Sequence, residues 1–539
     1  MKHIFLSFIS IFSFQFAFSQ DEVFDFGKCR IRILKQSERE LRLRRAADEL
    51  FLTSESGRFR LHFYDSGSDA LPFIDINGNS ITDYIDTALV EIDEIYKQEV
   101  TDLGMSFPNL ETVDIYFYSI GDLYGETTLS SNCDYPYTGK SEIHVNSLIN
   151  ADFLSTNGMD MIRVTLAHEF HHVLQFQKGA WMGRDCSSDS FSSYDFLFYY
   201  EMAAVFYEEA VYDRINDYYS YIKYGNGNGR TVFAEPNSPS LYSNAGNYIY
   251  GSGIFFIFIR DQYGLQKAKE VEKRILELLP DYPPTVSMAK ACTDVLNVPV
   301  TEVFHNYSTA VSLTQNWKMD GRSFSEADSY PLLAKKANSI SVSDVGTVSM
   351  FIPISPTGFS IYWLSYNGRE YPLVFSNGNF EQFNDEGYST APDNMNVFVD
   401  LKRLSVEFSV QNLRNFKTIK ASLIDTVSNS VYDFSAKSVY KFDGSELTSF
   451  PNPVNLSKSE VLNIPVKGSS DSPKIILQIF DITGKVLLSK TGVAFSSDLI
   501  IFEINLLKDL KPQVSSGVYF YFASSGDKVL NSGKFAVIK

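Results

Sequence analysis

The sequence predicts an α+β protein in which a mixed helical and β domain is followed by two β-sandwich domains. Helical periodicity and alternating apolar runs share the chain up to about residue 320. Between residues 342 and 441 the helical periodicity disappears, and short alternating runs are separated by Gly, Asn and Pro. Alternation continues from Phe450 to the end. We therefore expect domains at residues 58–320, 321–446 and 447–539.

The first residues have the pattern of an export signal. A Lys-His pair precedes an apolar stretch over residues 4–18, and the small residues Ala17 and Ser19 have the spacing of a signal-peptide cleavage site. We therefore expect residues 1–19 to be a signal peptide and the mature chain to begin at Gln20. No later apolar stretch reaches the roughly 18 residues that cross a bilayer, so the sequence predicts an exported protein without a transmembrane span.

Composition limits the partners and the redox state. The 47 Lys and Arg residues are outnumbered by 65 Asp and Glu residues, which gives a net charge of −18. This charge argues against nucleic acid or an anionic membrane as the main partner. The even number of cysteines in an exported chain is compatible with two disulfides, whose pairing stays open, among Cys29, Cys133, Cys186 and Cys292.

Local patterns predict the elements of the first half of the chain. Residues 20–57 are expected to be a helical segment, because the charged stretch at 38–51 is amphipathic; it either packs on the next domain or belongs to a short prosegment. Alternating runs then predict strands at residues 59–64, 113–120 and 142–147. A helix at 87–98 separates the first two. The third strand is either a sheet edge, to which an extended peptide could add, or an inner strand.

Helices follow, and then strands take over. Apolar residues at helical spacing predict helices at residues 196–213 and 249–262, the second ending before Gly264. Residues 321–446 are expected to form a β-sandwich. The last domain is expected to be a separate small β-sandwich with strands at residues 475–481, 485–488, 500–504, 517–523 and 534–538.

The most informative motif is an H-E-x-x-H run at residues 168–172. Its flanks contain no charge, Pro or Gly, which predicts a helix that ends near Gly179. Side chains four positions apart project from one helix face, so His168 and His172 can bind one zinc ion. Glu169 lies about 100° around the helix, where a carboxylate can take a proton from zinc-bound water. The alternative is an ordinary helix with surface histidines.

A catalytic zinc site needs a third protein ligand and an open position for water. Glu201, in the aromatic and alanine-rich stretch of the next predicted helix, is the best candidate, because a buried carboxylate is costly unless a cation partners it. Glu208, two turns later on the same face, is either a fallback ligand or an acceptor for a histidine N–H. Asp195 is a further alternative.

These residues resemble the gluzincin metallopeptidases, in which an H-E-x-x-H helix is followed by a second helix that supplies a Glu. In the aminopeptidase-like branch the second helix reads W-x-x-E-G-x-A-x-x-x-E, and residues 199–208 are similar, with Met202 in place of the Gly and a longer connection between the helices. The resemblance implies a zincin-like metallopeptidase domain. It also implies one general base, Glu169, and three Zn²⁺ ligands, His168, His172 and Glu201.

Two tyrosines and one further histidine need an interpretation. Tyr248 and Tyr250 resemble the tyrosine positions of the same branch, and Tyr250 is the candidate to donate a hydrogen bond to the developing oxyanion. Packing is the alternative for either of them, because the chain contains 32 tyrosines. His171 lies about 100° from His172 around the helix, so we expect a satisfied or exposed histidine there and not a ligand.

Residues 75–86 place oxygen side chains at the spacing of an EF-hand type loop, which predicts a Ca²⁺ site. The candidate ligands are Asp75, Asn77, Asn79, Asp83 and Asp86. Ser80 replaces the turn glycine and Asp86 replaces the bidentate Glu, so the affinity would be reduced. The alternative is an Asx-rich turn before a helix that starts at Asp83. Similar D-x-N-x-N segments occur in the resembling proteases.

The last domain resembles the type IX secretion C-terminal sorting domain. The likeness rests on ordered motifs: F-P-N-P at residues 450–453, F-D-I-T-G-K at 480–485, and S-G-V-Y-F at 516–520. It implies that the signal peptide carries the chain across the inner membrane and that this tail engages the type IX secretion machinery at the outer membrane. The tail is then usually removed. The protein is therefore expected to be secreted or held at the outer cell surface.

The sequence thus predicts a secreted or cell-surface zinc metallopeptidase that hydrolyses a peptide or protein substrate through zinc-activated water. The first alternative is an exported binding protein or adhesin whose β domains carry the function and whose zinc site is structural or inactive. A second alternative is a zinc hydrolase that acts on another amide or on an ester. The sequence leaves the substrate and the cleavage specificity open.

Overall fold

The computed structural model describes residues 29–33, 49–107, 110–129, 141–151, 155–178, 197–223, 231–233, 241, 248–333, 338–380, 383–384, 387–388, 393–410, 418–435, 449, 451–457, 460–467, 474–493, 499–510, 514–525 and 528–539. The chain forms two compact units. One consists of Met1–Ser341, Ile354–Pro392 and Thr418–Asp433, and the other of Val342–Pro353, Asp393–Lys417 and Phe434–Lys539. Helices and several sheets occur together, which confirms the α+β class. None of the helices in the described segments has the length and apolar composition that crossing a bilayer requires. The predicted signal peptide lies outside the described residues.

A six-stranded sheet of the first unit positions the site. Its strands lie in the order β1 (Cys29–Ile33), β5 (Gly125–Leu129), β6 (Ser141–Asn146), β4 (Val113–Tyr118), β3 (Phe59–Phe63) and β2 (Leu50–Thr53). β3, β4 and β6 run parallel, β5 is antiparallel to β6, and β1 is parallel to β5. The three strands predicted in this region are confirmed, and β6 is the inner strand of the two alternatives.

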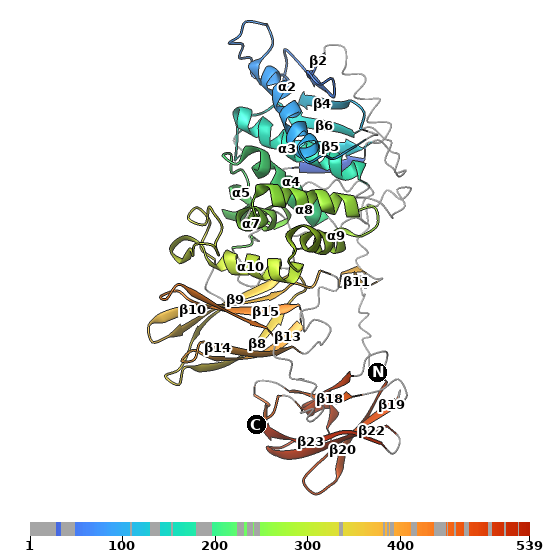
Figure 1. The fold of residues 1–539 in the computed structure, drawn as a ribbon, viewed down its shortest axis with the longest axis vertical. Helices are drawn as coiled ribbons and strands as arrows, with labels where there is room; N and C mark the ends of the chain where they lie inside the picture. Colours follow the sequence, from blue (N-terminus) through green and yellow to red (C-terminus); the bar gives the residue numbers. More distant parts are fainter. Residues whose placement is uncertain are drawn as a thin grey trace, which may run out of the picture. The chain divides into compact units, whose positions relative to one another are not determined.

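Two helices cover one face of this sheet (Figure 1). α2 (Asp83–Tyr96) continues as the π-helix η1 (Lys97–Thr101), and α3 (Gly158–Gln177) packs beside α2. α2 buries one face. Its buried residues follow one another at intervals of three or four positions: Ile85, Ala88, Ile92 and Ile95. Phe170 of α3 meets Phe59 of β3 edge-on, with 5.4 Å between ring centroids. This apolar core fixes α3 against β5 and β6.

The remaining helices of the first unit enclose a second apolar core. They are α4 (Leu197–Tyr212), α5 (Tyr219–Lys223), α6 (Tyr248–Gly251), α7 (Ile254–Tyr263), α8 (Leu265–Leu278), α9 (Pro284–Ala291), η4 (Cys292–Leu296), α10 (Val300–Ser312) and η5 (Gln315–Trp317). α4 is buried along almost its whole length, because its sequence is apolar on all sides and not on one face only. It packs directly on α3 and so joins the two cores.

Three local expectations are corrected by the structure. Leu50 and Phe51 lie in strand β2, so the helix expected at 38–51 is wrong at its end, and residues 34–48 lie outside the described segments. The helix expected at 249–262 is divided into α6 and α7 at Gly253, where a Cβ would lie 2.8 Å from Val205 Cγ1. Cys292 is free and buried, which excludes two disulfides, and burial raises the pKa of its thiol to about 12.

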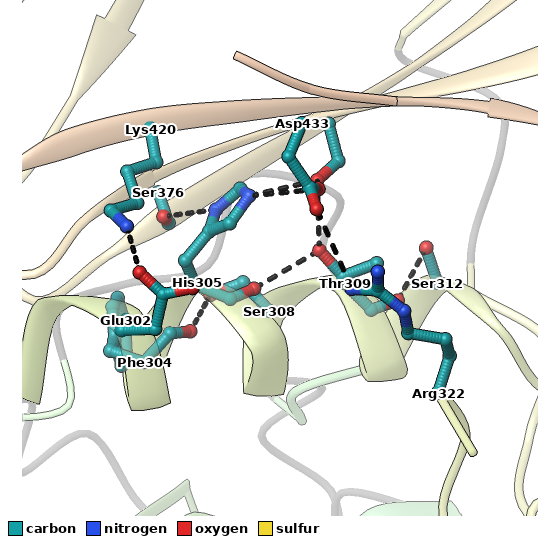
Figure 2. A network of polar contacts seen from close by, with 11 residues as sticks. Glu302, Phe304, His305, Ser308, Thr309, Ser312, Arg322, Ser376, Lys420 and Asp433 are labelled. Carbon is teal, nitrogen blue, oxygen red and sulfur yellow. Dashed lines mark hydrogen bonds and ion pairs between the residues drawn. The ribbon is translucent and has the colours of Figure 1, made fainter. Parts of the chain in front are cut away.

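A five-stranded sheet of the first unit packs on α10. Its strands lie in the order β16 (Ser430–Ser435), β15 (Ile419–Asp425), β10 (Arg369–Asn377), β9 (Phe359–Tyr366) and β7 (Ser339–Ser341). A short pair, β11 (Phe383–Asn384) and β12 (Gly387–Tyr388), forms its own two-stranded sheet. α10 lies across β10 and β15, and a polar network occupies that contact (Figure 2).

His305 of α10 is at the centre of this network (Figure 2). Its Nδ1 lies 2.7 Å from the Ser376 hydroxyl of β10, and its Nε2 lies 2.8 Å from the Ser422 hydroxyl of β15. Ser422 in turn donates to Asp433, whose carboxylate is half exposed and 3.8 Å from Nε2. Burial lowers the pKa of His305 and outweighs the attraction of Asp433, so the folded protein holds a neutral imidazole.

The second unit contains three further sheets. β14 (Ser405–Val410), β13 (Asp393–Asp400) and β8 (Thr347–Ile354) form one. In the C-terminal segment, one sheet has the order β17 (Val454–Asn455), β23 (Lys528–Ile538), β22 (Gly517–Ser525), β19 (Lys474–Phe480) and β20 (Val486–Val493). The other pairs β18 (Val461–Lys467) with β21 (Leu499–Asn505), which α11 (Leu506–Asp509) follows. A single apolar cluster includes residues of both sheets, as in a small β-sandwich.

We predict that His305 makes the first unit sensitive to acid. An unfolded chain binds a proton on this imidazole near pH 6.5, whereas the folded protein keeps it neutral, so the free energy of unfolding falls as the pH drops through that value. His305→Gln should therefore lose less stability between pH 7 and pH 5 than the wild type in urea unfolding. Ser376→Ala removes a hydrogen-bond partner but no titratable group, and it should shift stability equally at both pH values. Parallel profiles for His305→Gln and wild type would contradict this role.

Candidate metal centre

The H-E-x-x-H motif lies in the middle of α3, inside the packed core. His168, Glu169 and His172 are each at most 1 % exposed. The rings of His168 and His172 are one helical turn apart, with centroids 4.8 Å apart and planes at 87° to each other. These are therefore buried histidines on one helix face, and the alternative of surface histidines is wrong.

Glu201 of α4 completes a group of three. Its Oε2 lies 3.1 Å from His168 Nε2 and 3.8 Å from His172 Nε2. These values bracket the separation of about 3.4 Å expected between two ligands of a tetrahedral zinc ion. One donor atom from each residue lies within 4.8 Å of the others, so among the described His, Cys, Asp and Glu side chains this group could hold a metal ion.

The outer nitrogens of both imidazoles are held by acceptors. His168 Nδ1 lies 2.7 Å from Glu208 Oε1, and His172 Nδ1 lies 2.9 Å from Gln175 Oε1. A carboxylate or amide oxygen at Nδ1 keeps the ring proton there and turns Nε2 into the ligand atom. His172 Nε2 is buried and makes no hydrogen bond within the described part of the chain. A buried nitrogen that accepts no hydrogen bond lowers the stability of the fold unless a ligand binds to it. The residues of this group therefore fit a metal ion.

The electrostatics of this group favour positive charge. Burial opposes a charged imidazole, but hydrogen bonds to Glu201 and Glu208 outweigh burial and raise the pKa of His168 to about 10. Burial also opposes ionisation of Glu201, yet the attraction of His172 and the hydrogen bond from His168 lower the pKa of Glu201 to about 2. Two buried carboxylates therefore face two imidazoles, and a dication is the partner that such a set attracts most strongly.

Glu169 follows His168 in α3 and is held by β5. The Thr127 hydroxyl donates a hydrogen bond of 2.6 Å to Glu169 Oε2 and lies 3.0 Å from the Glu169 carbonyl oxygen. Gly125 permits this approach, because a Cβ there would lie 2.5 Å from Glu169 Oε1. β5 is not among the strands predicted from the sequence, although the β-branched pair Thr127-Thr128 is a weak strand signal.

Tyr250 is brought close to the ligands. Tyr248 and Tyr250 are both buried in α6. The Tyr250 ring centroid lies 6.2 Å from that of His168 and 5.0 Å from that of Tyr221. Tyr250 therefore adjoins the group, and its role as an oxyanion donor stays a prediction. Asp195, the further alternative for the third ligand, lies outside the described residues.

The other flank of α3 holds a polar cluster that the sequence does not predict. His171 Nδ1 lies 3.1 Å from Glu99 Oε2 of η1, and His171 Nε2 lies 3.1 Å from Glu272 Oε1 of α8. Tyr199 of α4 donates to the same Glu272 oxygen at 2.7 Å. His171 is thus a satisfied histidine, as expected. Burial raises the pKa of both carboxyls, that of Glu272 to about 8.

The predicted calcium loop folds as a hydrogen-bonded turn before α2. Asp75 Oδ1 accepts hydrogen bonds from two backbone N–H groups at 2.7 and 3.1 Å. The side-chain amides of Asn77 and Asn79 both donate to Asp86 Oδ2 at 2.8 Å. α2 begins at Asp83, as the Asx-turn alternative requires. The five candidate residues are therefore brought together, and Ca²⁺ binding by them stays a prediction.

Comparison with known proteins leaves the family open. No protein-family model matches the chain, and no curated protein matches it. A β-glucosidase from Listeria innocua in complex with glucose is similar over 17% of this chain and 16% of its own, with 15% identity and a TM-score of 0.13. Dimeric latent PorU from Porphyromonas gingivalis is similar over 39% of this chain and 21% of its own, with 16% identity and a TM-score of 0.14. Likenesses this weak carry no argument about fold or function.

We predict that one zinc ion per chain binds to the three-residue group. His172→Ala and Glu201→Ala should each reduce the zinc content well below one per chain, measured by elemental mass spectrometry after gel filtration. Glu208→Gln should weaken zinc affinity about 10- to 100-fold, because the acceptor at His168 Nδ1 is lost in part. The matched control is Glu209→Gln, since Glu209 is a neighbouring buried carboxyl that pairs with Arg260 at 3.6 Å. Full zinc content in Glu201→Ala would rule out this ligand.

We predict that Glu272 destabilises the fold as the pH rises. A neutral His171 donates through one nitrogen and accepts through the other, so one of its two carboxyl partners must carry a proton. The folded pKa of Glu272 is about 8, above its ordinary value of 4.5, so the folded state binds a proton that the unfolded chain has lost between these values. Between pH 4.5 and about pH 8, the free energy of unfolding of wild type should therefore fall, relative to that of Glu272→Gln, by up to about 1.4 kcal/mol for each unit by which the pH rises. Denaturant titrations at pH 5 and pH 8 measure this difference, and a pH-independent difference would refute it.

Proposed function

We propose that this protein is a secreted or cell-surface zinc-dependent metallopeptidase of gluzincin type. One observation carries the proposal: in α3, the residue that follows His168 of the buried group His168, His172 and Glu201 is Glu169, whose carboxylate is held separately by Thr127. A structural zinc site is closed by four protein ligands, whereas a catalytic site combines three ligands with a neighbouring base. The donor set on α3 and α4 supports the second arrangement.

The residues around this group have separate tasks in the proposed reaction. A zinc ion held there would polarise the scissile carbonyl and make a water molecule more acidic. Glu169 accepts the proton of that water and passes it to the leaving amine. Thr127 fixes the plane of the Glu169 carboxylate through its hydrogen bond to Oε2. Tyr250, next to His168, is the proposed donor to the oxyanion.

The proposal includes the route of export. The signal-peptide pattern at residues 1–19 supports passage through the inner membrane. The three motifs of the C-terminal segment support recognition by the type IX secretion machinery. This segment has its own apolar core, as a domain needs if it is recognised and removed as a unit.

We predict that Glu169→Gln reduces peptide hydrolysis by about 10²- to 10⁴-fold, because an amide of the same size cannot accept the proton. The zinc content should stay at one per chain, since Glu169 is not a ligand. Thr127→Val keeps the shape of the side chain but removes the hydrogen bond to Glu169, and it should give a smaller loss. The measurements are kcat/KM on casein or a peptide library, together with zinc content.

The outcomes separate this function from its main alternative. A binding protein or adhesin with an inactive site would show no hydrolysis by any zinc-loaded form of the protein. Hydrolysis that a chelator abolishes and zinc restores supports the peptidase. Equal hydrolysis by wild type and zinc-loaded Glu169→Gln would show that the role assigned to Glu169 is wrong.

A further inference from the structure

β1 covers the outer edge of the strand that holds Glu169. β5 has β6 on one side and β1 on the other. β1 pairs with β5 in parallel over its whole length, from Cys29 opposite Gly125 to Ile33 opposite Leu129. In the part of the sheet that the structure describes, β1 is the last strand on this side. The outward-facing backbone N–H and C=O groups of β5 are therefore paired with a segment of the same chain.

This edge is the part of the sheet that adjoins the proposed general base. Gly125 and Thr127, two positions apart and hence on one face of β5, both approach Glu169. The residues of β1 in register with them are Cys29 and Ile31. A main chain in the position of β1 therefore lies only one strand spacing, about 4.8 Å, from the backbone that contacts Glu169.

Such an edge is suited to bind the substrate of a peptidase. An exposed strand edge binds the main chain of an extended peptide whatever its side chains are, because backbone groups make the hydrogen bonds. β6, the edge considered from the sequence, is paired on both sides by β5 and β4. β2 is the strand at the opposite side of the sheet. The sheet has two edges, one at β2 and one at β1 and β5. The second of these edges is the one whose strand β5 contacts Glu169.

We propose that β1 occupies the substrate edge of β5, so that the enzyme is latent until β1 leaves and an extended peptide adds in its place. This inference rests on the proposed function and adds to it a substrate class, unfolded or extended polypeptide, and a form of regulation. β1 suits this role because it pairs with one strand only and over five residues. Its removal leaves β5 paired with β6 and leaves the helices on the sheet in place.

The test releases β1 within the full-length, zinc-loaded protein. In Arg30→Pro/Ile31→Pro, one of the two prolines removes a donor that faces β5, because adjacent residues of a strand direct their N–H groups to opposite sides. We expect this variant to hydrolyse a disordered peptide at least ten-fold faster than wild type. The matched control is Leu50→Pro/Phe51→Pro, which disrupts β2 at the other edge of the same sheet and should leave the rate unchanged.

Hydrogen exchange gives a readout that does not depend on turnover. In the Glu169→Gln background, the two prolines in β1 should increase exchange at Gly125–Leu129. Addition of the disordered peptide should then restore protection at these amides. With β1 intact, the same peptide should cause no change there. If the proline variant does not fold, judged by exchange in α3, a Gly-Ser replacement of residues 29–33 takes its place.

The two proposals fail in different ways. If no variant hydrolyses peptides but the peptide still protects β5 after β1 is released, the metallopeptidase proposal fails and the peptide-binding edge stands. If wild type hydrolyses peptides as fast as the proline variant, or if the peptide leaves β5 unprotected, β1 is an ordinary edge strand. Either of these last results overturns the inference.

Discussion

The contact between α3 and α4 governs the first unit, because it buries two imidazoles and two carboxylates that need one another. Each of these groups would cost several kcal/mol if it were removed from water without a partner. Glu208 and Gln175 satisfy the outer nitrogens of the two rings, and Glu201 faces their inner nitrogens. The core of the unit and its candidate metal centre are therefore one structure, and neither can change without the other.

α3 is fixed by a different kind of contact on each of its sides. Its apolar residues, such as Phe170, pack on the sheet. Glu169 is held by Thr127 of β5, and His171 is held by carboxyls of η1 and α8. A helix held by polar contacts on two sides has little freedom to rotate, and rotation is the motion that would misalign ligands four residues apart. The cluster around His171 thus restrains α3 next to the metal group, although it contributes no ligand.

The sequence predicts the parts of this site that depend on spacing within one element. His168 and His172 follow from the helical repeat, and Glu201 follows from the cost of a carboxylate among apolar neighbours. The contacts of β5 and of His171 could not be predicted in the same way, because they join residues that are distant in the sequence. A signal did exist for Glu272, which lies among Ala268, Val271 and Ile275 on the buried face of α8. The strand at residues 50–53 was missed because a charged amphipathic stretch precedes it, and sheet pairing overrides such a local preference.

Burial itself raises the question of access. The side chains of His168, His172 and Glu201 are at most 1 % exposed, whereas hydrolysis requires a peptide carbonyl to reach the water molecule that lies within about 3 Å of the proton acceptor Glu169. A substrate therefore cannot react unless part of the packing around the group opens. α3, α4 and β5 cannot be that part, since they supply the ligands and hold the base. β1 pairs with β5 at the edge of the described sheet, and the residues assigned to the metal group and to the base lie in other elements, so its departure would leave those residues in place.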